Sequence, residues 1–260
     1  MTWFSSLNPV AQGLIATAFT YSVTALGASL VFFFRTVRQK PLDLMMGFAS
    51  GVMIAASFWS LLSPALELSA QLGQSACLVA ALGFLSGGAF TMLSDVFLSK
   101  MRTFHGKKSL KSAFLLACAV TLHNIPEGLA VGVAFGCVSA GCEGTSLLSA
   151  CMLALGIGIQ NFPEGACVSV PMRKTGASPL KCFLVGQGSG LVEPIAGVLG
   201  VLAALSVQGI LPFALTFSAG AMIAVVCSEL IPESFRDSKA LATAGVLSGF
   251  TVMMLLDVAF

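Results

Sequence analysis

Three glutamates lie inside long apolar stretches of the sequence, and each has a proline directly beside it: Glu127, Glu164 and Glu193. A charge at the centre of a bilayer costs roughly 2.5–3.5 kcal/mol on insertion scales. Three carboxylates at similar depth therefore need a cation, a proton or a water-filled cavity. His123 and Gln160 precede Glu127 and Glu164 by four residues. On a helix this spacing puts both side chains of a pair on one face, about 6 Å apart along the axis.

The neighbouring prolines add further oxygen atoms to this picture. A proline inside a helix has no N–H, so it frees the carbonyl four residues earlier. For Pro126 and Pro163 the freed carbonyls belong to the residues just before His123 and Gln160. Imidazole, carboxylate and amide oxygens at one depth indicate a site for a divalent cation such as Zn²⁺, Fe²⁺ or Mn²⁺. An isolated buried His or Glu is instead often a packing residue or a proton relay, and the metal interpretation depends on the whole set.

The composition shows which kind of protein must position these residues. Of 260 residues, 57% are hydrophobic and 9% are charged, with a mean hydropathy of +0.95. Soluble domains carry about 25% charged residues. This excludes a soluble enzyme, a secreted disulfide scaffold and a nucleic-acid-binding protein. The chain is expected to be an all-α integral membrane protein.

The apolar stretches between charge clusters predict eight transmembrane helices, because one crossing needs about 20 apolar residues. The connections are short, so residues 1–260 should form a single polytopic domain. Asp43 and Glu67, at the two ends of the second helix, are interpreted as interface charges. The predicted spans are residues 10–34, 43–66, 74–98, 112–136, 146–171, 180–206, 210–232 and 240–259.

The basic residues predict the orientation. All 13 Lys and Arg fall in or beside the first, third, fifth and seventh loops. Because cytoplasmic loops are enriched in Lys and Arg, these loops should be cytoplasmic and both termini outside. Cys137 and Cys142 flank the fourth loop, and they could form a disulfide or remain two ordinary thiols.

Two sequence echoes predict inverted internal repeats. Residues 48–55 (Phe-Ala-Ser-Gly-Val-Met-Ile-Ala) resemble residues 217–224 (Phe-Ser-Ala-Gly-Ala-Met-Ile-Ala), and residues 123–128 (His-Asn-Ile-Pro-Glu-Gly) resemble residues 160–165 (Gln-Asn-Phe-Pro-Glu-Gly). Each pair lies on spans of opposite direction, as in transporters with a midplane binding site. Chance recurrence of small residues is a serious alternative for the first pair only.

These motifs resemble those of the ZIP (Zrt/Irt-like) family of metal transporters. The Pro-Glu-Gly motifs of spans four and five carry the resemblance, and residues 228–233 and 192–194 are similar to the bacterial, GufA-like branch. The resemblance covers the whole chain. It implies a homodimer and a scaffold, including spans two and seven, against which the metal-carrying helices slide.

The resemblance also implies two adjacent metal positions and a mouth of the pathway. In this chain, Asn161 stands where an acidic residue is common, so the second position should bind metal more weakly. The implied residues are His123, Glu127, Gln160 and Glu164 for the first position, Asn124, Asn161 and Glu193 for the second, with Glu127 and Glu164 bridging, and Asp95 and Glu229 for the mouth.

The resulting hypothesis is secondary transport of a divalent transition metal into the cytoplasm by alternating access. Zinc is the expected cargo, with Fe²⁺, Mn²⁺ and Cd²⁺ left open, and a metal-selective channel with the same ligands is the alternative. We expect no enzymatic activity, because the H-E-x-x-H motif of zinc proteases is absent. We also expect no cofactor and no nucleic-acid partner, and a multi-pass location in a cell membrane, specifically a bacterial inner membrane.

Overall fold

The computed structural model describes residues 2–33, 39–103, 110–142, 145–173, 176–206 and 208–259, and every regular element in these ranges is a helix. This confirms the all-α prediction. Local sequence explains where several helices begin. Asn8 and Ser178 precede helices that start with proline, and their side-chain oxygens accept hydrogen bonds from the backbone N–H of Ala11 and Lys181. Such caps satisfy N–H groups that have no partner within the helix.

The helices follow the predicted spans closely, after a short first helix, α1 (Thr2–Ser5). Several spans are built from more than one element, and a short 3₁₀ turn, η3 (Gln208–Ile210), precedes the seventh. In chain order the spans are α2 (Pro9–Phe33); α3 (Gln39–Ala56), η1 (Ser57–Leu62) and α4 (Ser63–Gln71); α5 (Ala76–Thr103); α6 (Leu110–Ala140); α7 (Leu147–Met172); α8 (Pro179–Gly190) and α9 (Val192–Ser206); α10 (Leu211–Val225), η4 (Val226–Leu230) and α11 (Ile231–Ser234); and α12 (Lys239–Ala259).

Within the described residues, six of these spans are long and apolar enough to cross a membrane. They are the first, second, third, sixth, seventh and eighth, so the chain is a multi-pass membrane protein. The fourth and fifth predicted spans correspond to α6 and α7, with 31 and 26 residues. Their crossing of the membrane stays a prediction.

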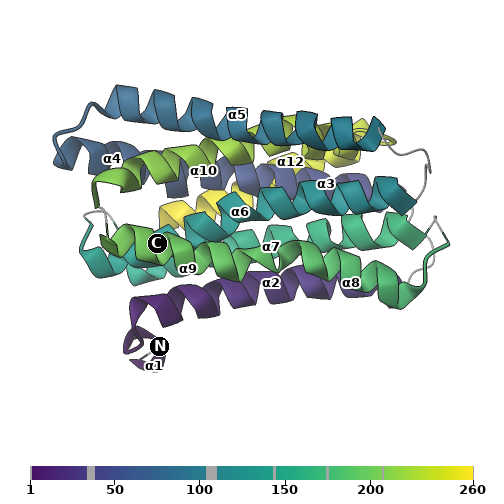
Figure 1. The fold of residues 1–260 in the computed structure, drawn as a ribbon, viewed down its shortest axis with the longest axis horizontal. Helices are drawn as coiled ribbons and strands as arrows, with labels where there is room; N and C mark the ends of the chain where they lie inside the picture. Colours follow the sequence, from purple (N-terminus) through teal and green to yellow (C-terminus); the bar gives the residue numbers. More distant parts are fainter. Residues whose placement is uncertain are drawn as a thin grey trace.

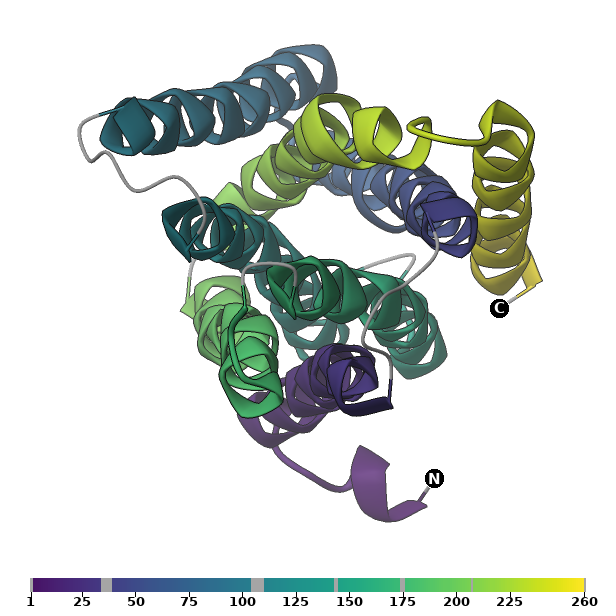
Figure 2. The same cartoon turned by 90° about the vertical axis from the view of Figure 1, so that its right-hand side faces the viewer.

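The helices pack as two bundles, which Figure 2 shows end on. The first bundle, which we name the cage bundle, contains α2, α6, α7, α8 and α9. Its closest packing is between α2 and α7 and between α6 and α9. The second bundle contains α3, α4, α5, α10, α11 and α12, with its closest packing between α3 and α12 and between α5 and α10. The bundles meet where α6 and α7 contact α3 and α10.

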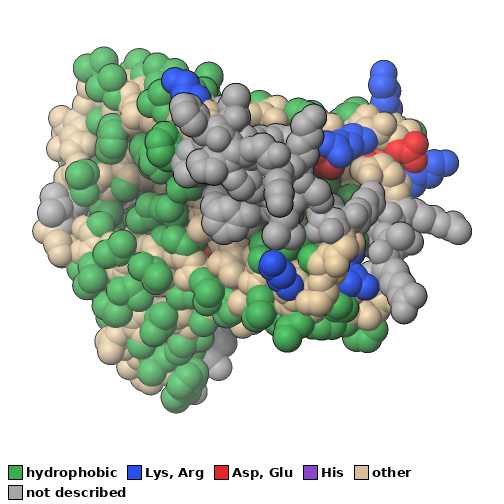
Figure 3. All heavy atoms as spheres, turned by 45° about the vertical axis from the view of Figure 1, so that its right-hand side comes forward, with side chains coloured by type: hydrophobic (Ala, Val, Ile, Leu, Met, Phe, Trp, Pro, Cys, Tyr) green, Lys and Arg blue, Asp and Glu red, His purple; other side chains and the backbone are tan. Residues whose placement is uncertain are grey.

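Both chain ends lie toward the same end of the molecule (Figure 1), as an even number of crossings requires. In Figure 3, hydrophobic side chains dominate the left part of the surface, and most of the visible Lys and Arg side chains lie on the right. The described basic residues of the loops sit at the helix ends opposite the termini. This arrangement agrees with cytoplasmic odd-numbered loops, and the outside location of the termini stays a prediction.

Three predicted spans are irregular: the second, the sixth and the seventh. The second and the seventh each contain a π-helical turn, η1 and η4 respectively. Each turn begins two residues after the repeated eight-residue segment and ends two residues before a proline, Pro64 or Pro232. Because proline cannot donate to the preceding turn, the helix adjusts its hydrogen bonds there. The same irregularity at the same offset favours a true internal repeat over chance.

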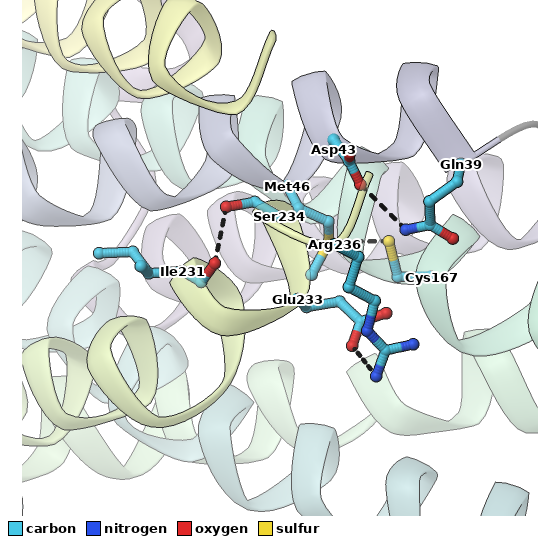
Figure 4. Close-up of polar contacts among 8 residues, drawn as sticks. All are labelled: Gln39, Asp43, Met46, Cys167, Ile231, Glu233, Ser234 and Arg236. Atoms are coloured by element: carbon cyan, nitrogen blue, oxygen red, sulfur yellow. Dashed lines mark hydrogen bonds and ion pairs between the residues drawn. The ribbon is translucent and has the colours of Figure 1, made fainter. Parts of the chain in front are cut away.

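The interpretation of Asp43 as an interface charge is wrong, whereas Glu67 is exposed as expected. Asp43 is fully buried, and its Oδ2 accepts hydrogen bonds from the backbone N–H groups of Asp237 (3.0 Å) and Ser238 (2.7 Å). Its Oδ1 accepts a bond from Gln39 (Figure 4). Asp43 therefore caps the start of α12 from a different helix.

Replacing Asp43 by alanine should destabilise the fold, because two N–H groups at the start of α12 would lose their acceptor. An unsatisfied buried polar group costs about 1–3 kcal/mol. We expect a lower midpoint of thermal unfolding in detergent for Asp43→Ala. Asp237→Ala is the matched control, since the Asp237 side chain is exposed and only its backbone takes part. Equal midpoints for the two variants would contradict the capping role.

Candidate metal centre

The predicted ligands come together in the interior of the cage bundle. Asn124 and Glu127 lie on α6, Gln160 and Asn161 on α7, and Glu193 on α9, and all five side chains are fully buried. Glu164 on α7 is 6% exposed. His123 also lies on α6, but its side chain is outside the described part of the structure. Six of the seven predicted residues can therefore be compared with the prediction.

Pairs of the three glutamates are close enough for their charges to interact. Glu127 is within electrostatic reach of both Glu164 and Glu193, and Glu164 is within reach of Glu193. Like charges held together in a bundle interior repel each other unless a cation or hydrogen-bond donors compensate them. The hydrogen-bond donors around each glutamate therefore decide how its charge is compensated.

Glu127 has few donors. Gln160 Nε2 donates to Glu127 Oε1 at 2.9 Å, which links α6 to α7. Glu127 Oε2 and Gln160 Oε1 are buried and accept no hydrogen bond from any side chain or backbone group that the structure describes. The amide oxygens of Asn124 and Asn161 are also buried without a partner. Four of the predicted ligand residues thus each present an unpaired acceptor oxygen to the interior.

Glu193 is the opposite case. Asn161 Nδ2 donates to Oε1 at 3.0 Å and to Oε2 at 2.9 Å. The hydroxyls of Thr24 and Thr20 lie within hydrogen-bond distance of Oε1 (3.3 Å) and of Oε2. Each hydroxyl shares its single hydrogen with a backbone carbonyl of α2, that of Thr20 at 3.3 Å and that of Thr17 at 2.9 Å. Both carboxylate oxygens are therefore occupied by donors from α2 and α7.

The two threonines are site residues that the sequence analysis missed. They lie four residues apart on α2, on the buried face that also carries Thr17. Their spacing matches the i, i+4 pattern used to find His123 and Glu127. A hydroxyl in an apolar helix gives a weak signal, however, because it can bond to its own backbone, as Thr17 does with the carbonyl of Gly13.

The break in the sixth span brings Glu193 to the site. The sixth span is interrupted at one residue, Leu191, which lies between the end of α8 and the start of α9. Asn124 Nδ2 donates at 3.0 Å to the carbonyl of Ser189, in the last turn of α8. The side chain thus satisfies a carbonyl near the end of a helix, where intrahelical partners are missing.

The glycines of the two Pro-Glu-Gly motifs allow the helices to approach. A Cβ on Gly128 would lie 2.5 Å from the carbonyl oxygen of Glu193, and one on Gly165 would lie 2.0 Å from that of Thr24. Both distances are too short for a side-chain atom, so only glycine fits. The α6–α9 crossing therefore places Glu193, and the α2–α7 crossing places Thr24, beside the ligands.

In the described part of the chain, no three side chains of His, Cys, Asp and Glu lie together closely enough to hold a metal ion. The first predicted position takes one ligand from Gln160 and another from His123, whose side chain is not described. We use the term cage for its three described residues, Glu127, Gln160 and Glu164. Any cation held there would need the amide oxygen or the imidazole as well as the carboxylates.

The residues predicted for the pathway mouth lie near each other and lead away from the cage. Glu229 is within electrostatic reach of Asp95, Glu164 and Glu233. Glu233 forms an ion pair with Arg236 at 2.7 Å (Figure 4). Because Asp95 and Glu233 lie near the basic helix ends, this series of carboxylates leads from the cage toward the end predicted to be cytoplasmic.

A sulfur contact joins the two bundles near the same end. Cys167 on α7 lies 2.8 Å from the sulfur of Met46 on α3, and Figure 4 shows the two side chains pointing toward each other. Cys167 is also within electrostatic reach of Glu164 and Glu233. The path from the cage therefore passes the junction of the bundles. Cys137 and Cys142, by contrast, are both free thiols.

Comparison with known proteins finds zinc transporters. The family described as ZIP Zinc transporter matches residues 101–257. The chain is 38% identical to zinc transporter ZIP11 of Xenopus tropicalis and 36% identical to that of Homo sapiens, each over 96% of this chain and 98% of the relative. It is also 36% identical to zinc transporter GufA of Myxococcus xanthus, over 94% of this chain and 97% of the relative.

The close approach at Gly165 gives a direct prediction. Gly165→Ala should push α2 away from α7, and overpacking of this kind typically costs about 1–3 kcal/mol. We expect a lower unfolding midpoint in detergent. Gly188→Ala on α8 is the matched control, because a Cβ there would meet no atom within 4 Å. If both variants unfold at the wild-type temperature, α2 and α7 are not held as closely as described.

Proposed function

The chain belongs to the ZIP zinc transporter family, and we propose that it carries zinc across the membrane into the cytoplasm by alternating access through the cage. The cation would be held by Glu127, Gln160 and Glu164, with His123 as the fourth ligand. Zinc is the cargo that the names of the relatives favour. The relatives come from animals and bacteria, so the bacterial inner membrane stays a prediction, as does the homodimer.

One observation carries this proposal: the buried oxygens without donors. In folded proteins nearly all buried polar atoms have a hydrogen-bond partner. Among the described residues, Glu127 Oε2, Gln160 Oε1 and the amide oxygens of Asn124 and Asn161 have none. All four atoms are acceptors, so a cation satisfies them and a further acceptor would not.

The types of ligand suit a cargo that must bind and leave. Zinc takes imidazole nitrogen and carboxylate oxygen at about 2.0–2.2 Å. Gln160 Nε2 already donates to Glu127 Oε1, which leaves Glu127 Oε2 and Gln160 Oε1 as the oxygens that a cation could use. Oxygen ligands hold borderline cations less firmly than several thiolates would. The cage therefore favours exchange over permanent storage.

The arrangement of the bundles supports alternating access over a fixed pore. The cage and the threonines beside it all lie in the cage bundle, whereas Asp95, Glu229 and Glu233 lie in the second bundle. A shift of one bundle against the other would move the cage relative to these carboxylates. Because the carboxylates lie near the basic, predicted cytoplasmic end, they would receive the cation as it leaves.

Zinc flux measured in proteoliposomes loaded with a zinc-sensitive dye tests the proposal. The variant Glu127→Gln keeps the side-chain volume but removes one anionic ligand. Even supporting residues of metal sites cost 10–100-fold when replaced, so we expect the flux to fall at least about tenfold. Glu67→Gln, at an exposed position outside the cage, should keep wild-type flux.

Two other results would contradict the proposal. Equal flux in wild type and Glu127→Gln would remove the cage from the pathway. Flux that rises linearly with zinc, without saturation, would favour the metal-selective channel over alternating access.

A further inference from the structure

We propose that the cage carries one cation at a time, because a hydrogen-bond clamp on Glu193 takes the place of a second cation. The clamp consists of Asn161, Thr20 and Thr24, which donate to the Glu193 carboxylate. This inference rests on the proposed function, and it concerns the second metal position implied by the resemblance.

The contrast between two buried glutamates carries the inference. Glu127 has one oxygen that accepts from Gln160 and one that accepts nothing. Glu193 has no unpaired oxygen, since the Asn161 amide bridges both and each also accepts a threonine hydroxyl. A second cation would have to displace these donors before it could reach Glu193. The first position needs no such displacement at Glu127 Oε2.

The charge balance points the same way. Hydrogen bonds to an ionised group are roughly twice as strong as those between neutral groups. The Asn161 amide, which bridges both oxygens, and the two threonine hydroxyls, which also reach backbone carbonyls, therefore compensate part of the Glu193 charge. Glu127 and Glu164 remain to balance the two charges of a single divalent cation. The oxygens still open at the second position, on Asn124 and Asn161, are neutral amides. A second cation would therefore find no free carboxylate oxygen on Glu193.

The orientation of Asn161 is fixed by its surroundings. Its Nδ2 also approaches the backbone carbonyl of Thr20, at 3.3 Å. Turning the amide over would place its oxygen against the Glu193 carboxylate and against that carbonyl. Three acceptors around one group require the nitrogen to face them, so Asn161 acts as a donor here.

The threonines act as positioning residues. Thr20 and Thr24 lie one turn apart on α2, and the close approach at Gly165 holds that stretch of α2 against α7. A Cβ on Gly27 would likewise lie 2.0 Å from the carbonyl oxygen of Phe162. The threonine donors therefore lie on α2, whose distance from α7, the helix of Asn161, is fixed by these two backbone contacts.

The test is the number of zinc ions bound per chain at saturating zinc, measured by equilibrium dialysis and elemental analysis of the full-length protein in detergent. Zinc that binds to other sites on the surface adds the same number of ions to every variant. The test is therefore the difference in bound zinc ions between the variants and wild type. We expect Glu127→Gln to bind one ion fewer than wild type and Glu193→Gln to bind the same number as wild type. Asn161→Asp should bind one more, since it removes a donor and adds an anionic ligand.

Asn8→Asp, the same change at an exposed position, should keep the wild-type number. A loss of one ion in Glu193→Gln would overturn the clamp while leaving the proposed function intact. No gain in Asn161→Asp relative to Asn8→Asp would also overturn it. If Glu127→Gln binds as many ions as wild type, the cage itself is wrong and the proposed function fails. Should Asn161→Asp not fold, the two glutamine variants decide alone.

Discussion

The structure depends on one constraint: electron-rich oxygens are buried in the middle of a helix bundle with too few donors to satisfy them. Glu127, Gln160, Asn124 and Asn161 each carry an unpaired buried acceptor. A bundle surrounded by lipid has little water to compensate such atoms, so leaving them unpaired is costly. In the proposed function, a cation compensates these acceptors while it is bound.

Several backbone features around the site position those oxygens. The break at Leu191 begins the α9 helix just before Glu193, and the glycines of the two Pro-Glu-Gly motifs let α9 and α2 approach at backbone distance. The Pro-Glu-Gly motif therefore combines a proline inside a helix, a carboxylate and a close helix crossing within three residues. Outside the cage bundle, Asp43 caps α12 from α3 and ties the second bundle together. The division into two bundles places the cage on one side of the junction between them.

Much of the fold and the site could be predicted from the sequence. Carboxylates inside apolar stretches are energetically costly, and residues four apart share a helix face, so both patterns are visible in the sequence. The confirmed family, the all-α fold and the six described helices that are long and apolar enough to cross a membrane follow from composition and motifs. The remaining features depend on contacts between distant residues. Thr20 and Thr24 looked like ordinary residues of an apolar helix, and only the packing of α2 against α9 shows that they face Glu193. Asp43 could not be told from an interface charge until the start of α12 was placed beside it, and the break before Glu193 required the packing of α6.

The central claim is that a cation replaces the missing donors in the cage. Anomalous X-ray scattering at the zinc edge, from crystals grown with zinc, tests it most directly because it locates the ion without assumptions about transport. The account predicts a peak within coordination distance, about 2.0–2.2 Å, of Glu127 Oε2 and of the Gln160 amide oxygen. Zinc found only at Asp95 and Glu229, with water or protein donors filling the cage, would contradict it.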